Sequence, residues 1–366
     1  MATRIVNEYE PDYVSPPGET LEEILNDRET SQIDLARRTG RTSKFINEII
    51  KGKARITPDF ALELERVMGI PDSFWNNRQR HYDAFKTRKK ESEALMKSIE
   101  WAKKFPYSKM AGFKCVPDIN DKLERLKNLL NFFGVASPDA WHTTWDNTIA
   151  SCNYRKSAKF STDEYALAAW LRRGELVAHA IECRKYNRTN FMKALRKIRG
   201  LTTLCPNEFQ PKLIDICRLC GVVVAFIPEF PKTASGATRW ITPSKALIQL
   251  SLKYKTNDHF WFTFFHEAAH ILFHQKRPIF IEDGNASNAH EQEADDFATE
   301  WLIPSNEYYA FIDQCRSSRI SKHSIKSFAE KIGIAPGIIV GRLQHNKKIL
   351  HSHCNDLKIS YNWIIN

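Results

Sequence analysis

The stretch that decides the fold is Trp261-Phe262-Thr263-Phe264-Phe265-His266-Glu267-Ala268-Ala269-His270-Ile271-Leu272-Phe273. Apolar residues flank the polar ones on all sides, which predicts a buried helix. His266 and His270 stand four residues apart and so share one helix face, where a single metal ion can take a nitrogen from each. The carboxylate of Glu267 can then act as general base toward a metal-bound water. The pattern predicts the zinc-binding helix of a hydrolytic site.

A tetrahedral zinc ion with an open position needs a third protein ligand, and the acidic stretch 290–304 supplies candidates. We expect a second helix here, with Glu291 as the third ligand. Asp295, one turn on, is expected to accept the outer N–H of a ligand histidine. Glu293 is the rival ligand, because it points about 200° round the helix from Glu291 and only one of the two can face the ion. The alternative interpretation is a solvated acidic helix face beside histidines that pack in a core.

A different pattern lies near the N-terminus, from Ser31 to Lys53. Ser31 can cap a first helix, Gly40 can supply a turn, and either Thr42 or Ser43 can cap a second helix. In such an arrangement the second helix presents its N-terminal residues to base edges in the major groove, and basic residues at its end meet phosphates. The residues expected to contact DNA are Gln32, Thr42, Ser43, Lys44, Asn47, Lys51, Lys53 and Arg55. A small dimerisation module with solvated basic residues is the alternative.

The histidine helix and the acidic stretch 290–304 resemble a known family. The H-E-A-A-H helix, the E-x-E-A-D-x-F-A segment and Leu302-Ile303-Pro304 look like the ImmA/IrrE group of metallopeptidases, and the likeness spans roughly residues 200 to 350. The resemblance implies a zinc-dependent endopeptidase of narrow substrate choice. Across the family's motif, the third ligand falls most naturally on Glu291.

The N-terminal residues resemble a second family. Pro16-Pro17-Gly18-Glu19-Thr20-Leu21 and Asp72-Ser73-Phe74-Trp75-Asn76-Asn77 look like the HigA-type antitoxins of the XRE repressor class, and the likeness covers residues 15 to 82. The resemblance implies a helix-turn-helix domain that binds double-stranded operator DNA as a homodimer. A cognate toxin, a repressor or another protein substrate is then the expected protein partner.

Composition sets limits on the class of protein. The chain has 366 residues, 42% of them hydrophobic and 27% charged, and its net charge of +11 favours a polyanionic partner. No apolar run reaches membrane-spanning length, and Met1 to Glu10 lacks the features of a signal peptide, so we expect a cytoplasmic protein without membrane contact. Basic residues between 184 and 199 could extend a DNA footprint, bind RNA or form an exposed helix face.

The expected fold is mainly α with a C-terminal α+β part. We expect a helix-turn-helix DNA-binding domain at residues 1–85, a helical connector at 86–200, and a zincin-like metallopeptidase domain with a small sheet at 201–366. The apolar run 221–227 predicts a strand, and residues 237–241 with 246–252 predict a hairpin.

Two functions remain open from the sequence. The first is an antitoxin-like repressor whose peptidase half cleaves itself or a partner and so relieves repression. The second is a DNA-binding antitoxin or regulator whose zinc domain is a non-proteolytic sensor or docking module. Glu267 favours the first, because a purely structural zinc site needs no base.

Overall fold

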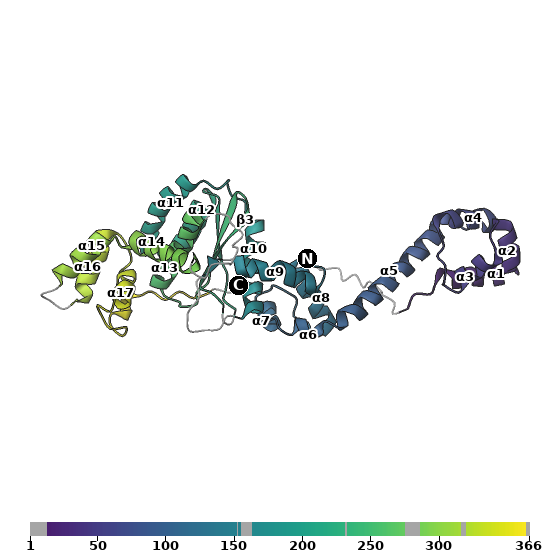
Figure 1. Cartoon of the computed structure of the whole chain (residues 1–366), viewed down its shortest axis with the longest axis horizontal. Helices are drawn as coiled ribbons and strands as arrows, with labels where there is room; N and C mark the ends of the chain where they lie inside the picture. The colour runs from purple at the N-terminus through teal and green to yellow at the C-terminus, as the bar shows by residue number, and fades with distance from the viewer. Residues whose placement is uncertain are drawn as a thin grey trace, which may run out of the picture. The chain divides into compact units, whose positions relative to one another are not determined.

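A computed structural model describes residues 13–151, 153–154, 163–230, 233–274, 286–315 and 320–363. The chain divides into two compact units, Met1–Ser98 and Ile99–Asn366, both mainly helical (Figure 1). Residues 1–10, on which the expectation about a signal peptide rests, lie outside the described residues. In the described part of the chain, no helix is both long and apolar enough to cross a membrane.

The first unit is built from helices around a small core. Its described elements are α1 (Pro17–Asp27), α2 (Gln32–Thr39), α3 (Ser43–Ile50), α4 (Pro58–Met68) and α5 (Asp72–Met96). Buried residues from all five helices, among them Leu21, Leu35, Ile46, Phe60 and Trp75, form one hydrophobic cluster. Gly18 permits the closest approach, because a Cβ atom there would lie 1.9 Å from the carbonyl oxygen of Ile49. The start of α1 therefore packs directly against the backbone at the end of α3.

The second unit combines helices with a small sheet. Its helices are α6 (Ile99–Ala102), α7 (Tyr107–Gly112), α8 (Lys122–Phe133), α9 (Pro138–Ser151), α10 (Glu164–Ala180), α11 (Arg188–Gly200), α12 (Pro206–Arg218), α13 (Asn257–Phe273), α14 (Ala286–Leu302), α15 (Ser305–Gln314), α16 (Lys322–Ile332) and α17 (Pro336–His345), with short 3₁₀ turns η1 (Leu201–Thr203) and η2 (Asn355–Leu357). Its strands are β1 (Asn153–Tyr154), β2 (Val222–Phe226), β3 (Gly236–Thr242) and β4 (Lys245–Leu250). The predicted fold class is confirmed.

The four described strands form one sheet in the order β1-β3-β4-β2. Strands β3 and β4 are antiparallel, with Trp240 opposite Ala246, so the predicted hairpin is confirmed. Strand β2 runs parallel to β4, and the predicted strand at 221–227 is confirmed within one residue at each end. The short strand β1 pairs antiparallel with the outer edge of β3, with Tyr154 opposite Ala237.

Helices cover both faces of the sheet. Helix α13 packs against β3 and β4 on one face, and α10 packs against β2, β3 and β4 on the other. The amide of Gln249 on β4 donates a hydrogen bond to the carbonyl oxygen of Trp170 on α10, at 2.7 Å. Gly174 makes room for that amide, since a Cβ atom there would lie 1.8 Å from its oxygen. The finer division of the chain into a connector and a peptidase domain stays a prediction.

Two arginines from the basic stretch 184–199 cap helices of the second unit. Arg188 donates to the carbonyl oxygen of Leu272 at the end of α13, at 3.1 Å. Arg199 donates to the carbonyl oxygens of Leu302 at 3.1 Å and Ile332 at 2.8 Å, at the ends of α14 and α16. A cation at a helix C-terminus pairs with its unsatisfied carbonyls and with the helix dipole. These two side chains therefore stabilise the helices that carry the predicted site.

Candidate functional site

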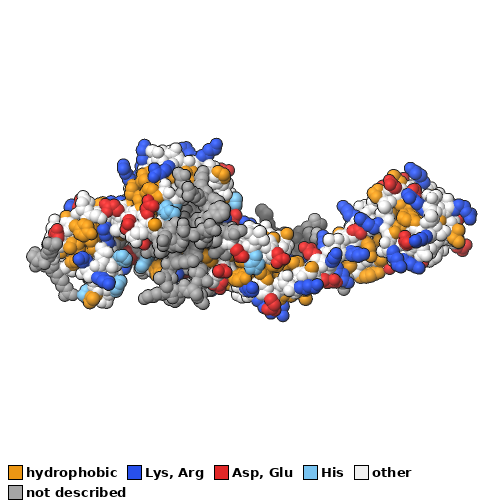
Figure 2. Space-filling model, in the orientation of Figure 1, with side chains coloured by type: hydrophobic (Ala, Val, Ile, Leu, Met, Phe, Trp, Pro, Cys, Tyr) orange, Lys and Arg blue, Asp and Glu red, His pale blue; other side chains and the backbone are white. Residues whose placement is uncertain are grey.

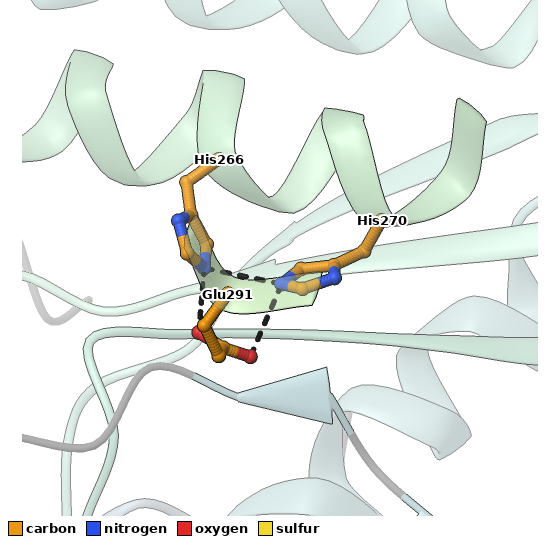
Figure 3. A group of neighbouring side chains, drawn as sticks. All are labelled: His266, His270 and Glu291. Atoms are coloured by element: carbon orange, nitrogen blue, oxygen red, sulfur yellow. Dashed lines mark hydrogen bonds and ion pairs between the residues drawn. The ribbon is translucent and has the colours of Figure 1, made fainter. Parts of the chain in front are cut away.

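His266 and His270 project from one face of α13 (Figure 3). The helix is apolar on almost every side and lies buried between the sheet and neighbouring helices, so each of the two histidines is only 1% exposed. Their Nε2 atoms lie 3.1 Å apart. Two ring nitrogens that converge at this distance can both bind one metal ion.

Glu291 completes the group from α14, which packs along α13. Its carboxylate oxygens lie 3.2 Å from Nε2 of His266 and 3.5 Å from Nε2 of His270. A zinc ion bound tetrahedrally at about 2.1 Å holds its ligand atoms roughly 3.4 Å apart. The two ring nitrogens lie 3.1 Å apart, and each has one carboxylate oxygen of Glu291 at about this spacing. Two imidazoles with one carboxylate are the donor set of a hydrolytic zinc site. The residues therefore fit one zinc ion.

Charges around the two histidines set different pKa values. Asp295 lies 2.8 Å from Nδ1 of His266. Burial lowers the pKa of His266, but hydrogen bonds with Asp295 and Glu291 and the charge of Glu267 outweigh burial and raise that pKa to about 9. Burial, together with the neighbouring histidines, lowers the pKa of His270 to about 2. At neutral pH the metal-free pair thus holds a protonated His266 and a neutral His270.

Glu267 of α13 is fully buried, and its side chain lies beside Gly236, the first residue of β3. The hydroxyl of Thr238 donates to the main-chain oxygen of Glu267 at 3.1 Å, which ties this turn of α13 to the strand. A Cβ atom at Gly236 would lie 2.7 Å from Oε1 of Glu267, so the glycine leaves the space that the carboxylate fills. The carboxylate acts electrostatically on His266, whose pKa it raises. The role of Glu267 as general base stays a prediction.

The rival acid Glu293 approaches a different histidine. Its Oε2 lies 3.0 Å from Nε2 of His274, and Nδ1 of His274 lies 2.7 Å from Nδ1 of His270. Glu293 is outside the group that could hold a metal among the described residues. Sequence reasoning missed His274, although the motif extended by one turn reads H-E-A-A-H-I-L-F-H and places it four residues after His270. The assignment of Glu291 as ligand and Asp295 as its support stays a prediction.

The helix-turn-helix has the predicted local geometry. Gly40 ends α2 with φ +69°, in the left-handed region that favours glycine. The hydroxyl of Ser31 accepts a hydrogen bond from the Asp34 amide at 3.1 Å and so caps α2. The hydroxyl of Thr42 accepts from the Phe45 amide at 3.2 Å, so Thr42 rather than Ser43 caps α3. The cap therefore places the start of α3 at Ser43, and the first residues of this helix, Ser43 and Lys44, are exposed.

Most side chains predicted to contact DNA are exposed, and lysines and arginines are spread over the visible face of the first unit (Figure 2). The exposed members of the set are Thr42, Ser43, Lys44, Lys51, Lys53 and Arg55, whereas Gln32 and Asn47 are half-buried. Arg55 pairs with Asp83 of α5. Sequence reasoning missed Arg41, which makes two hydrogen bonds with Glu63 of α4, at 2.9 and 2.7 Å, beside the α2–α3 turn. All of these DNA contacts stay predictions.

Two parts of the chain are similar to known proteins. The family model of the peptidase M78 group, described as the IrrE N-terminal-like domain, matches residues 220–341, which include His266, His270 and Glu291. An antidote protein of a plasmid maintenance system from Nostoc punctiforme is 30% identical, with 23% of this chain covering 94% of it, at a TM-score of 0.21. A HigA-family addiction module antidote protein from Coxiella burnetii is 32% identical, with 23% of this chain covering 91% of it, at a TM-score of 0.21.

Residues 220–341 are an IrrE N-terminal-like domain. The N-terminal region is similar to the two antidote proteins. A search of curated proteins found no match. Each of the two antidote proteins matches 23% of this chain, and more than nine tenths of each antidote protein is covered by the match.

Proposed function

We propose that this chain is a DNA-binding transcriptional regulator that relieves repression by zinc-dependent cleavage of a protein, either itself or a partner. One observation carries the proposal: the same chain holds a capped helix-turn-helix and a His-His-Glu group, in which both histidines and the neighbouring Glu267 are buried. When a DNA-binding helix and a hydrolytic site belong to one polypeptide, cleavage can be coupled to release of the protein from DNA.

The DNA half of the proposal rests on α3. Its N-terminal residues Thr42, Ser43 and Lys44 are exposed, and Asn47 follows one turn later, at the position where an amide can pair with adenine. We propose that two copies form a homodimer, which places two such helices about 34 Å apart on an inverted repeat. Because the relatives are antidotes of addiction and plasmid maintenance modules, a cognate toxin is a natural partner.

The peptidase half rests on α13 and α14. His266, His270 and Glu291 would hold the zinc ion, which supplies a Lewis acid for the peptide carbonyl and an activated water. Glu267 takes the proton of the attacking water and delivers it to the leaving amine. Asp295 accepts a hydrogen bond from Nδ1–H of His266 at 2.8 Å and so keeps Nε2 of His266 turned toward the ion.

The experiment compares a reporter under the cognate promoter in cells that carry wild-type protein or Glu267→Gln. Glutamine matches glutamate in size but cannot take a proton from water, so metal and fold should persist while cleavage stops. We expect induction in wild-type cells and lasting repression in Glu267→Gln cells. Glu330→Gln, an exposed glutamate on α16, serves as the matched control and should behave like wild type. Equal induction in all three strains would favour a non-proteolytic sensor.

A further inference from the structure

His274 stands one helical turn after His270, at the C-terminal end of α13. Its side chain is only 7% exposed, and both ring nitrogens have partners. Nδ1 lies 2.7 Å from Nδ1 of His270, and Nε2 lies 3.0 Å from Oε2 of Glu293 on α14. The ring of His290 packs over it, with the ring centroids 4.3 Å apart. A continuous line of contacts therefore runs from Glu293 through His274 to His270.

The chemistry of these contacts fixes where the protons are. The carboxylate of Glu293 can only accept, so Nε2 of His274 carries a proton and donates it. A neutral imidazole then has a lone pair on its other nitrogen, so Nδ1 of His274 accepts a hydrogen bond from Nδ1 of His270. Nδ1 of His270 thus carries the ring proton, which leaves its Nε2 with a free lone pair. That lone pair faces His266 and Glu291.

We infer that His274 and Glu293 are positioning residues that hold His270 in the tautomer and orientation needed to bind the metal. The inference rests on the zinc site of the proposed function. It also gives the second acid of α14 a role: Glu291 turns toward the ligand nitrogens, while Glu293 acts on the outer side of His270. Partners on the outer nitrogen of a ligand histidine raise its basicity and fix its ring.

The two ligand histidines are supported in different ways. His266 meets a carboxylate directly, since Asp295 lies 2.8 Å from its Nδ1. His270 meets a carboxylate only through the ring of His274. An imidazole carries its hydrogen-bonding groups in a fixed plane, so the interposed ring extends the reach of Glu293 without loosening the geometry of His270.

The test measures zinc affinity by competition with a chromophoric chelator in the full-length protein. We expect His274→Phe, which keeps an aromatic ring but has no acceptor, to weaken zinc binding by about 10- to 100-fold. His274→Asn should restore most of the affinity, because its amide oxygen can accept from Nδ1 of His270. Glu293→Ala should cause a smaller loss, since Glu293 is 54% exposed and water can replace it. Asp296→Ala, an acid of the same helix that pairs with Gln292, is the matched control and should bind zinc like wild type.

A second readout separates positioning from packing. With Co²⁺ in place of zinc, the visible absorption bands report coordination geometry, and they should change in His274→Phe and return in His274→Asn. The double variant His274→Phe with Glu293→Ala should bind zinc no more weakly than His274→Phe alone, because both residues act through one line of contacts.

The outcomes distinguish the inference from the function on which it rests. If the wild-type protein binds zinc and His274→Phe keeps both its affinity and its cobalt spectrum, the inference is overturned while the zinc site stands. A loss of thermal stability in His274→Phe with unchanged zinc affinity would also overturn it, by leaving His274 a packing role only. Wild-type protein that binds no zinc would overturn the zinc site and the inference together.

Discussion

Gly236 on β3 leaves the space that Glu267 on α13 occupies. A Cβ atom at position 236 would lie 2.7 Å from Oε1 of Glu267 and 2.5 Å from Cγ2 of Thr263. Real side chains do not tolerate such distances, so any larger residue at position 236 must displace the acid or the helix that carries it. The strand thus sets the position of the proposed general base.

Replacement of Gly236 by alanine should therefore impair cleavage and stability while sparing the metal ligands. We expect an overpacking cost of about 1–3 kcal/mol in the free energy of unfolding, measured by denaturant titration. Zinc content should stay at the wild-type level, because the three atoms nearest to an added Cβ belong to Thr263 and Glu267 and not to a proposed ligand. The control is Gly200→Ala at the end of α11, where no atom lies within 4 Å of an added Cβ. Equal stabilities of the two variants would contradict this account of Gly236.

Zinc analysis of the purified chain should find about one equivalent, held by two histidines and one acid. Glu291→Gln should lose most of the metal, because its oxygens lie 3.2 and 3.5 Å from the two Nε2 atoms. Glu293→Gln should keep it, since its carboxylate contacts His274 instead. Elemental analysis after dialysis checks both variants. Loss of zinc in Glu293→Gln alone would move the third ligand to Glu293.

Zinc uptake should release a proton at neutral pH. In the metal-free protein the pKa of His266 is raised to about 9. The proton on Nδ1 of His266 stays in its hydrogen bond to Asp295, so zinc must displace the proton on Nε2. Because the raised pKa favours the protonated, metal-free form below pH 9, the apparent zinc affinity should rise about tenfold per pH unit toward that value and then level off. Titration calorimetry in buffers of different ionisation enthalpy measures the released proton directly. An affinity that does not change between about pH 6 and 8 would contradict the assigned protonation.

Local sequence signals predicted the parts of the site that depend on one helix. The spacing of His266 and His270 places them on one face of any helix. Thr42 caps α3 through a hydrogen bond from the amide of Phe45, only three residues further along the chain. Sequence reasoning missed a third histidine, at the end of α13. His274 has the same spacing, but its role depends on α14 bringing Glu293 to its far side.

Long-range packing explains the other gaps. The expected helical connector at 86–200 includes the region of α10, yet only the tertiary fold pairs Gln249 of the sheet with Trp170. The sequence likewise showed a run of basic residues at 184–199, but not that Arg188 and Arg199 meet the ends of α13 and α14. Such contacts join residues far apart in the chain, and no local pattern encodes them.

Replacement of Asn47 by alanine should cost about 1–3 kcal/mol of binding free energy at the cognate operator while leaving weak general binding in place. The reason is that an amide reads base edges, whereas lysines and arginines contact phosphates of any sequence. Fluorescence anisotropy with cognate and scrambled duplexes at one salt concentration measures the sequence-specific and the general binding separately. Asn77→Ala, an exposed asparagine on α5, is the control. Equal weakening on both duplexes would mean that α3 does not read the sequence.

The central claim is that this regulator cuts a protein with Glu267 as the base. The most direct measurement is mass spectrometry of new protein N-termini, taken under inducing conditions from cells that carry wild-type chain, Glu267→Gln or the surface control Glu330→Gln. We predict at least one new terminus, in this chain or in a protein encoded beside it, that appears with wild type and the control and is absent with Glu267→Gln. The same set of termini in all three strains, with zinc bound and DNA released on induction, would contradict the peptidase account.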